Sequence, residues 1–141
     1  MASERALLQQ LAALRLEEAK LLFREKQFSG AYYIAGYAIE CALKACIAAQ
    51  FRENEIPDRK FVNDIYTHDL EELLALAGLQ KPLEMEWRSN PDFKIQWLVI
   101  IKWSGEARYT VWTEDQAKGI IDAIDGDGRI GGLFQWLSAR W

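Results

Sequence analysis

The longest apolar pattern of the chain lies between Ser29 and Phe51. Spaced at about 100° per residue, as in an α-helix, its small side chains form one narrow stripe. The members of this stripe are Ala31, Ala35, Ala38, Ala42, Ala45 and Ala49. Bulkier apolar residues flank the stripe, which predicts a buried central helix that a second helix approaches closely.

One seam of this central helix carries polar groups, at Tyr33, Tyr37, Glu40 and Lys44. Two interpretations are open. Glu40 and Lys44 can form an i, i+4 ion pair at the rim of the core, with the tyrosine hydroxyls reaching water. Alternatively, the seam faces a groove that receives a ligand or a partner.

The segment before the central helix is also amphipathic. A first helix is predicted from an N-cap at Ser3 to about Lys26, with leucines along one side. A short break at 28–30 follows, with Ser29 as the N-cap of the central helix. Such a short connection predicts an antiparallel helical hairpin.

The region after the central helix begins with a predicted loop at 52–66, which contains Pro57. Thr67 is expected to cap a third helix that ends at Gly78. Residues 82–90 are predicted to be irregular or a short turn of helix.

Pro91 fits the start of another helix over 92–103. Its β-branched residues make a strand at 97–101 the alternative, but a lone strand would have no partner, so helix is favoured. A loop is expected at 104–109.

The sequence from Thr113 to Gln116 has the pattern of a capping box and predicts the last long helix, which reaches Ile124. The glycines that follow should interrupt it before 133–141, at Gly126, Gly128, Gly131 and Gly132. Together these patterns predict an all-α fold, an up-and-down bundle of four to five helices, and a single domain over 1–141.

Composition narrows the functional classes. The chain has 141 residues, half of them hydrophobic, and a net charge of −4. This balance argues against a broadly basic nucleic-acid surface, although a local basic patch remains compatible with it. No signal peptide or bilayer-spanning run is visible, which predicts a cytoplasmic protein without a membrane partner.

Metal and disulfide chemistry have little support in the sequence. Cys41 and Cys46 are five residues apart on one helix, on different sides of it, and should not bridge. There is a single histidine and no CxxC pair, so we expect neither a metal site nor a cofactor.

Three segments together resemble a known family. They are the central-helix sequence from Ala31 to Lys44, the Thr-His-Asp-Leu sequence at 67–70, and the sequence at 103–109 that begins with Trp and ends with Arg-Tyr. In this arrangement the chain is similar, over most of 7–124, to the HEPN domain family of small helical domains.

The resemblance implies a helical bundle, commonly a homodimer, with a role in nucleotide or RNA chemistry. Many members are ribonucleases that assemble an Arg, four to six residues, then a His across the dimer. Others partner a minimal nucleotidyltransferase, often in a toxin–antitoxin pair, or bind nucleotides.

The ribonuclease motif is absent from this chain. An Arg paired with His68 would have to stand at 61–63, and a His paired with Arg108 at 113–115, but neither is there. We therefore expect no standard catalytic residues and a non-catalytic or degenerate HEPN domain. The alternative is a metal-independent ribonuclease toxin with a non-standard site built from Arg108, His68, Tyr37 or Lys44. A third possibility is a dimerisation domain without a ligand.

The candidate ligand- or partner-binding residues come from the polar seam and the two later segments. They are Tyr33, Tyr37, Glu40, Lys44, His68, Asp69, Trp103, Arg108 and Tyr109. For His68, ordering the start of the third helix is favoured over catalysis.

Arg108 stands between two aromatic residues and can hold a phosphate or stack on a base. Equally, it can form an ion pair with Glu40 or Glu106. The favoured geometry brings Glu40 and Arg108 together in one polar site. Six tryptophans in so small a chain favour a dimer interface.

Overall fold

The computed structural model describes residues 4–52, 54–127 and 131–141. Within these ranges the chain forms eight α-helices and one 3₁₀ helix, and no strand. They are α1 (Glu4–Arg24), α2 (Phe28–Ala48), α3 (Arg59–Asp64), α4 (Leu70–Leu76), α5 (Gln80–Ser89), α6 (Pro91–Ile100), η1 (Gly105–Tyr109), α7 (Glu114–Asp125) and α8 (Leu133–Ser138). The predicted all-α helical bundle is confirmed.

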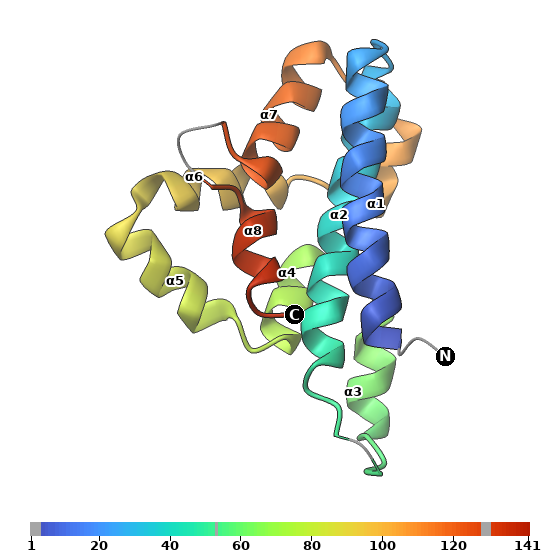
Figure 1. Ribbon diagram of the computed structural model, residues 1–141, viewed down its shortest axis with the longest axis vertical. Coiled ribbons are helices and arrows are strands. Elements are labelled where there is room, and N and C mark those ends of the chain that lie inside the picture. The colour runs from blue at the N-terminus through green and yellow to red at the C-terminus, as the bar shows by residue number, and fades with distance from the viewer. Residues whose placement is uncertain (1–3, 53, 128–130) are drawn as a thin grey trace.

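Helix α2 is the centre of the bundle. Five of the six alanines of the predicted stripe are buried, and only Ala49, just beyond the helix, is exposed. Helix α1 runs antiparallel along α2, as the short connection predicts, and α7, α8 and α4 pack against it as well (Figure 1). Helices α5 and α6 extend to the far side of α7 and α8. Helix α6 packs on α7 and α8, and α5 packs on α6.

Two predicted N-caps are wrong. Helix α2 begins at Phe28, so Ser29 lies inside it, where its Oγ accepts a hydrogen bond from the Trp112 backbone N–H at 2.9 Å. Helix α4 is capped by Asp69 rather than Thr67, because the Asp69 carboxylate accepts from the backbone N–H groups of Glu71 and Glu72. The predicted cap at Ser3 lies outside the described residues.

Three segments predicted as loop or irregular are helical. The region 52–66 contains α3, whose first turn is capped by the Asp58 carboxylate. Residues 80–89 form α5, where Pro82 stands in the first turn and is tolerated there. Residues 105–109 form η1, with Ser104 as its cap. These elements are short, so their periodicity is too brief to detect.

The remaining predicted helices are present, although α1, α2 and α6 each end two or three residues before the predicted position. Pro91 is the first residue of α6, and residues 97–100 are helical rather than a strand. Thr113 and Gln116 form the predicted capping box of α7. Helix α7 ends at Asp125, before Gly126, whose φ is +85°, and α8 follows from Leu133. Gly128 lies outside the described residues.

Both cysteines are buried thiols on α2 and are not bonded to each other. Burial raises the pKa of each to about 11, so they stay protonated near neutral pH. Among the described residues, no helix combines the length and the hydrophobicity that a membrane crossing requires.

Candidate functional site

Glu40 is the unusual residue of α2. Its exposed fraction is 3%, and among the described residues it is the one polar or charged side chain that is buried. A carboxylate withdrawn from water is costly unless hydrogen bonds and opposite charges compensate it. The residues that meet Glu40 are therefore the starting point of the candidate site.

Two cationic or protonatable side chains meet this carboxylate. His68 Nδ1 lies 2.8 Å from Glu40 Oε1, and Lys44 Nζ lies 3.5 Å from Oε2. We call Glu40, Lys44 and His68 the Glu40 cluster. The predicted Glu40–Lys44 pair is confirmed, and His68 joins it from the segment before α4. His68 thus ties the start of α4 to the central helix.

The contact with Glu40 fixes the orientation of the His68 ring. A carboxylate can only accept, so Nδ1 is the nitrogen that donates to it, which leaves Nε2 for another partner. The side chain of His68 is 65% exposed, whereas that of Glu40 is 4% exposed. A buried anion therefore holds an exposed imidazole that a ligand can reach.

Three aromatic rings continue the seam from the Glu40 cluster. Tyr33 stacks with Tyr37 and with Trp103, at ring-centroid distances of 6.3 and 6.0 Å. Trp103 Nε1 donates to the Tyr33 backbone oxygen at 3.1 Å. We call these three residues the aromatic ladder.

The aromatic ladder depends on the glycine beneath it. A Cβ atom at Gly36 would lie 2.2 Å from atoms of the Trp103 ring. Gly36 therefore allows the indole to rest directly on the backbone of α2. Sequence reasoning placed Gly36 in the family pattern without assigning this role to it.

Helix α1 contributes a cation that the sequence did not indicate. Arg15 forms an ion pair with Glu18, and this hydrogen bond raises its pKa. Its charge also acts on Tyr37, whose pKa is raised chiefly by burial. Arg15 lies on the side of Tyr37 because of the way α1 is aligned along α2. Helical periodicity does not specify that alignment.

The predicted meeting of Glu40 and Arg108 does not occur. No ion pair joins Arg108 to Glu40 or Glu106 in the described part of the chain; its guanidinium lies over the exposed Tyr109 ring, 4.9 Å from the centroid. Glu40 instead contacts His68, which lies 28 residues later in the chain.

Arg108 is nevertheless on the His68 side of η1. The nearest neighbour of a Cβ at Gly105 would be His68 Cβ, at 3.9 Å. In a 3₁₀ helix residues i and i+3 eclipse each other, so the Cβ of Arg108 points to the same side, one turn further along. Of the other candidates, Asp69 caps α4 and does not join the Glu40 cluster.

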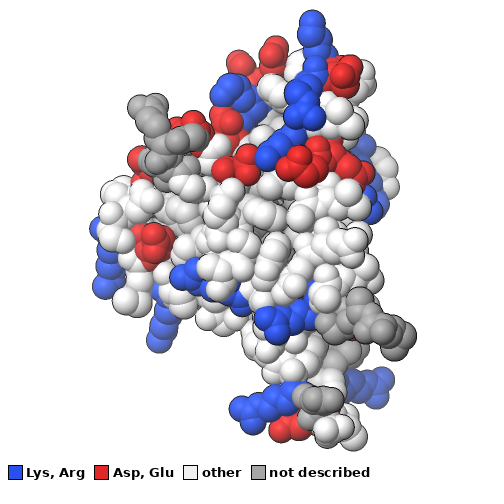
Figure 2. All heavy atoms as spheres, in the orientation of Figure 1, with Lys and Arg blue, Asp and Glu red and all other residues white. Residues whose placement is uncertain are grey.

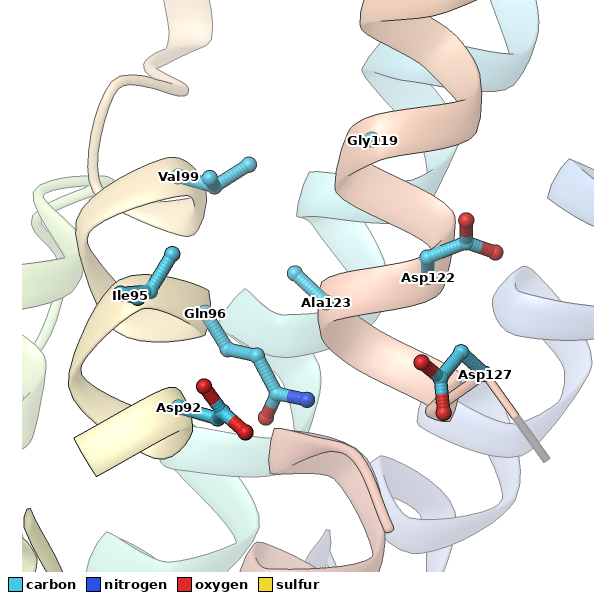
Figure 3. Close-up of a pocket in the computed structure, with 8 residues that line it drawn as sticks. All are labelled: Asp92, Ile95, Gln96, Val99, Gly119, Asp122, Ala123 and Asp127. Carbon is cyan, nitrogen blue, oxygen red and sulfur yellow. The ribbon is translucent and has the colours of Figure 1, made fainter. Parts of the chain in front are cut away.

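A separate hollow of about 330 Å³ opens between α6 and α7. Figure 3 shows Asp92 and Gln96 of α6 pointing toward α7, where Ala123 faces them, whereas the Asp122 carboxylate points away from α6. Asp122 is paired with Lys118. None of the candidate binding residues lines this hollow.

Within the residues that the structure describes, no group of three or more His, Cys, Asp and Glu side chains could hold a metal ion. Comparisons of the chain with family models, with curated proteins and with solved structures returned no match. The assignment of function therefore rests on the geometry of the Glu40 cluster and on the sequence resemblance.

Proposed function

We propose that this protein is a non-catalytic or degenerate HEPN domain that binds the phosphate of a nucleotide or of RNA at the Glu40 cluster. The observation that carries the proposal is the buried carboxylate that holds an exposed imidazole beside an ammonium group. Protonated His68 and Lys44 would place two positive charges against one negative charge. The net positive charge suits a phosphate, whose oxygens accept from both nitrogens.

The surroundings of the Glu40 cluster support the same ligand class. Arg108 lies on the His68 side of η1, one turn beyond Gly105. The partly exposed tyrosines of the aromatic ladder offer faces on which bases can stack. This local arrangement is compatible with the chain's net charge of −4, because the attraction acts over a few ångströms.

The test is a titration of the purified protein with ATP and with a short single-stranded RNA, followed by tryptophan fluorescence. We expect His68→Gln and Lys44→Gln each to weaken binding roughly tenfold, as loss of one charge-assisted hydrogen bond predicts. Lys81→Gln, on the exposed face of α5, is the matched control and should bind like the native protein. Equal affinities in all four proteins, or no binding to the native one, would contradict the proposal.

A metal-independent ribonuclease is the second candidate, favoured by one observation. Glu40 orients His68 through Nδ1 and leaves Nε2 free, which is the arrangement that proton transfer by an imidazole requires. The same RNA is therefore followed on a gel. Cleavage that persists in Lys81→Gln but is lost in both His68→Ala and Arg108→Ala would replace the binding proposal with this one.

The proposal includes a homodimer and a protein partner. The resemblance indicates a minimal nucleotidyltransferase, as in toxin–antitoxin pairs, as the partner. What supports the dimer is a row of leucines on the outer side of α1, at Leu7, Leu14 and Leu21, each about half exposed. If the protein were instead a dimerisation domain without a ligand, it would still have this row of leucines, but ATP and RNA would not change its tryptophan fluorescence.

A further inference from the structure

An apolar recess lies beside the Glu40 cluster. It is formed where the start of α1, the end of α2 and the segment after α3 meet, and its volume is about 170 Å³. Its walls are apolar or aromatic and comprise Leu8, Ile47, Ala48, Phe51, Ile65 and Tyr66. Charged side chains line it at two points, Lys44 and Glu4.

Lys44 belongs both to this recess and to the Glu40 cluster. It lines the recess, and its Nζ lies 3.5 Å from Glu40 Oε2. Tyr66, on the recess wall, precedes His68 by two residues. A ligand that enters the recess with an apolar group can therefore reach the phosphate-binding side chains with an anionic one.

Two aromatic side chains at the recess are exposed to solvent. The exposed fractions are 39% for Phe51 and 74% for Tyr66. Aromatic rings at the edge of an apolar opening are suited to stacking on a flat ring, which a nucleobase provides. They point to a planar group rather than an aliphatic chain as the occupant.

The size of the recess restricts that planar group. A cavity of roughly 150 Å³ accommodates one six-membered ring such as benzene. The recess, at about 170 Å³, has room for the single ring of a pyrimidine, whereas a purine would leave its second ring outside. Glu4 supplies a hydrogen-bond acceptor, which can bind the exocyclic amino group of cytosine or the N3–H group of uracil.

We propose that the recess binds the base of a pyrimidine nucleotide whose phosphate lies at Lys44 and His68. This inference rests on the proposed function, because it uses the Glu40 cluster as the phosphate site. It adds the class of base and the residues that select it.

The experiment compares CMP, UMP and ribose 5-phosphate by calorimetric titration of the native protein. We expect CMP and UMP each to bind at least tenfold more tightly than ribose 5-phosphate. Ala48→Leu, which fills the recess, should remove the advantage of CMP and leave the affinity for ribose 5-phosphate unchanged. Ala13→Leu, at an exposed position of α1, is the control.

The outcomes separate the two proposals. If ribose 5-phosphate bound as tightly as CMP and Lys44→Gln weakened both, base binding in the recess would be refuted and the phosphate site would be retained. CMP binding that Ala48→Leu abolishes but Lys44→Gln does not change would overturn the phosphate site and its link to the recess. No binding of any of the three compounds would overturn both proposals.

Discussion

Gly36 is the residue on which the shape of the aromatic ladder depends most directly. A Cβ there would lie 2.2 Å from the Trp103 ring, so the indole would have to leave its place and give up the hydrogen bond to the Tyr33 backbone. The sequence alone shows only a glycine inside a helix, where alanine is the better helix former by about 1 kcal/mol. The tertiary contact reverses that preference.

We predict that Gly36→Ala lowers the free energy of unfolding by about 1–3 kcal/mol, the usual cost of overpacking a core. Urea denaturation followed by tryptophan fluorescence measures this change. Gly119→Ala is the matched control, because nothing lies within 4 Å of a Cβ at that helical position. It should stabilise the protein by about 0.5–1 kcal/mol through helix propensity. A stabilised Gly36→Ala variant would contradict the close approach of Trp103.

At the scale of the elements, long helices are predictable and their mutual contacts are not. The apolar period reveals α1, α2 and α7, and local cap chemistry locates Thr113 because a capping box involves residues only three apart. Helix α5 escapes detection because only two of its ten residues, the buried Leu83 and the partly buried Trp87, pack against the core. Its helical state depends on tertiary packing that the local pattern does not show.

In the candidate site, too, one contact could be predicted from the sequence and another could not. Glu40 and Lys44 share a face of one helix, so their pairing follows from the four-residue spacing. The meeting of Glu40 with His68 depends on how the segment before α4 folds back onto α2, which no periodicity encodes. Sequence reasoning therefore found all three members of the Glu40 cluster and paired Glu40 correctly with Lys44, but it expected Arg108 where the structure has His68.

Asp69 provides a test at the element scale, because the sequence made it a candidate ligand-binding residue whereas the structure makes it the cap of α4. We predict that Asp69→Ala lowers the free energy of unfolding by about 1 kcal/mol, the usual cost of losing an N-cap. Asp69→Ser preserves a capping oxygen and should retain both stability and affinity for ATP and RNA. Denaturation and titration measure the two quantities. A stable Asp69→Ser variant that no longer binds would show that the carboxylate contacts the ligand.

For the whole molecule, the tryptophans fill the interior of the protomer. Trp97, Trp103 and Trp136 are buried, and Trp87, Trp112 and Trp141 are partly buried against the same core. Their number therefore does not argue for a dimer interface. On the face shown in Figure 2, charged side chains gather at the top, over the end of α1 and the start of α7, while the middle is largely uncharged.

The stronger argument for a dimer comes from the outer side of α1. Leu7, Leu14 and Leu21 are seven residues apart, so they drift by only about 20° per step and form one row. Their exposed fractions are 49, 48 and 51%, whereas Ala12, Leu16 and Ala19 on the opposite side of the helix are buried against the bundle. The protomer does not need these leucines for its core, and a row with heptad spacing is suited to packing against a second helix.

We predict that the native protein has twice the 16.2 kDa mass of one chain at micromolar concentration, and that Leu14→Gln dissociates it. The helical circular dichroism should stay unchanged, because Leu14 lies on the side of α1 away from the core. Leu98→Gln on α6 is the matched control, since Leu98 is 46% exposed but lies outside the row, and it should remain dimeric. Sedimentation velocity measures all three masses. A monomeric native protein would refute the dimer, and dissociation by Leu98→Gln alone would move the interface from α1 to α6.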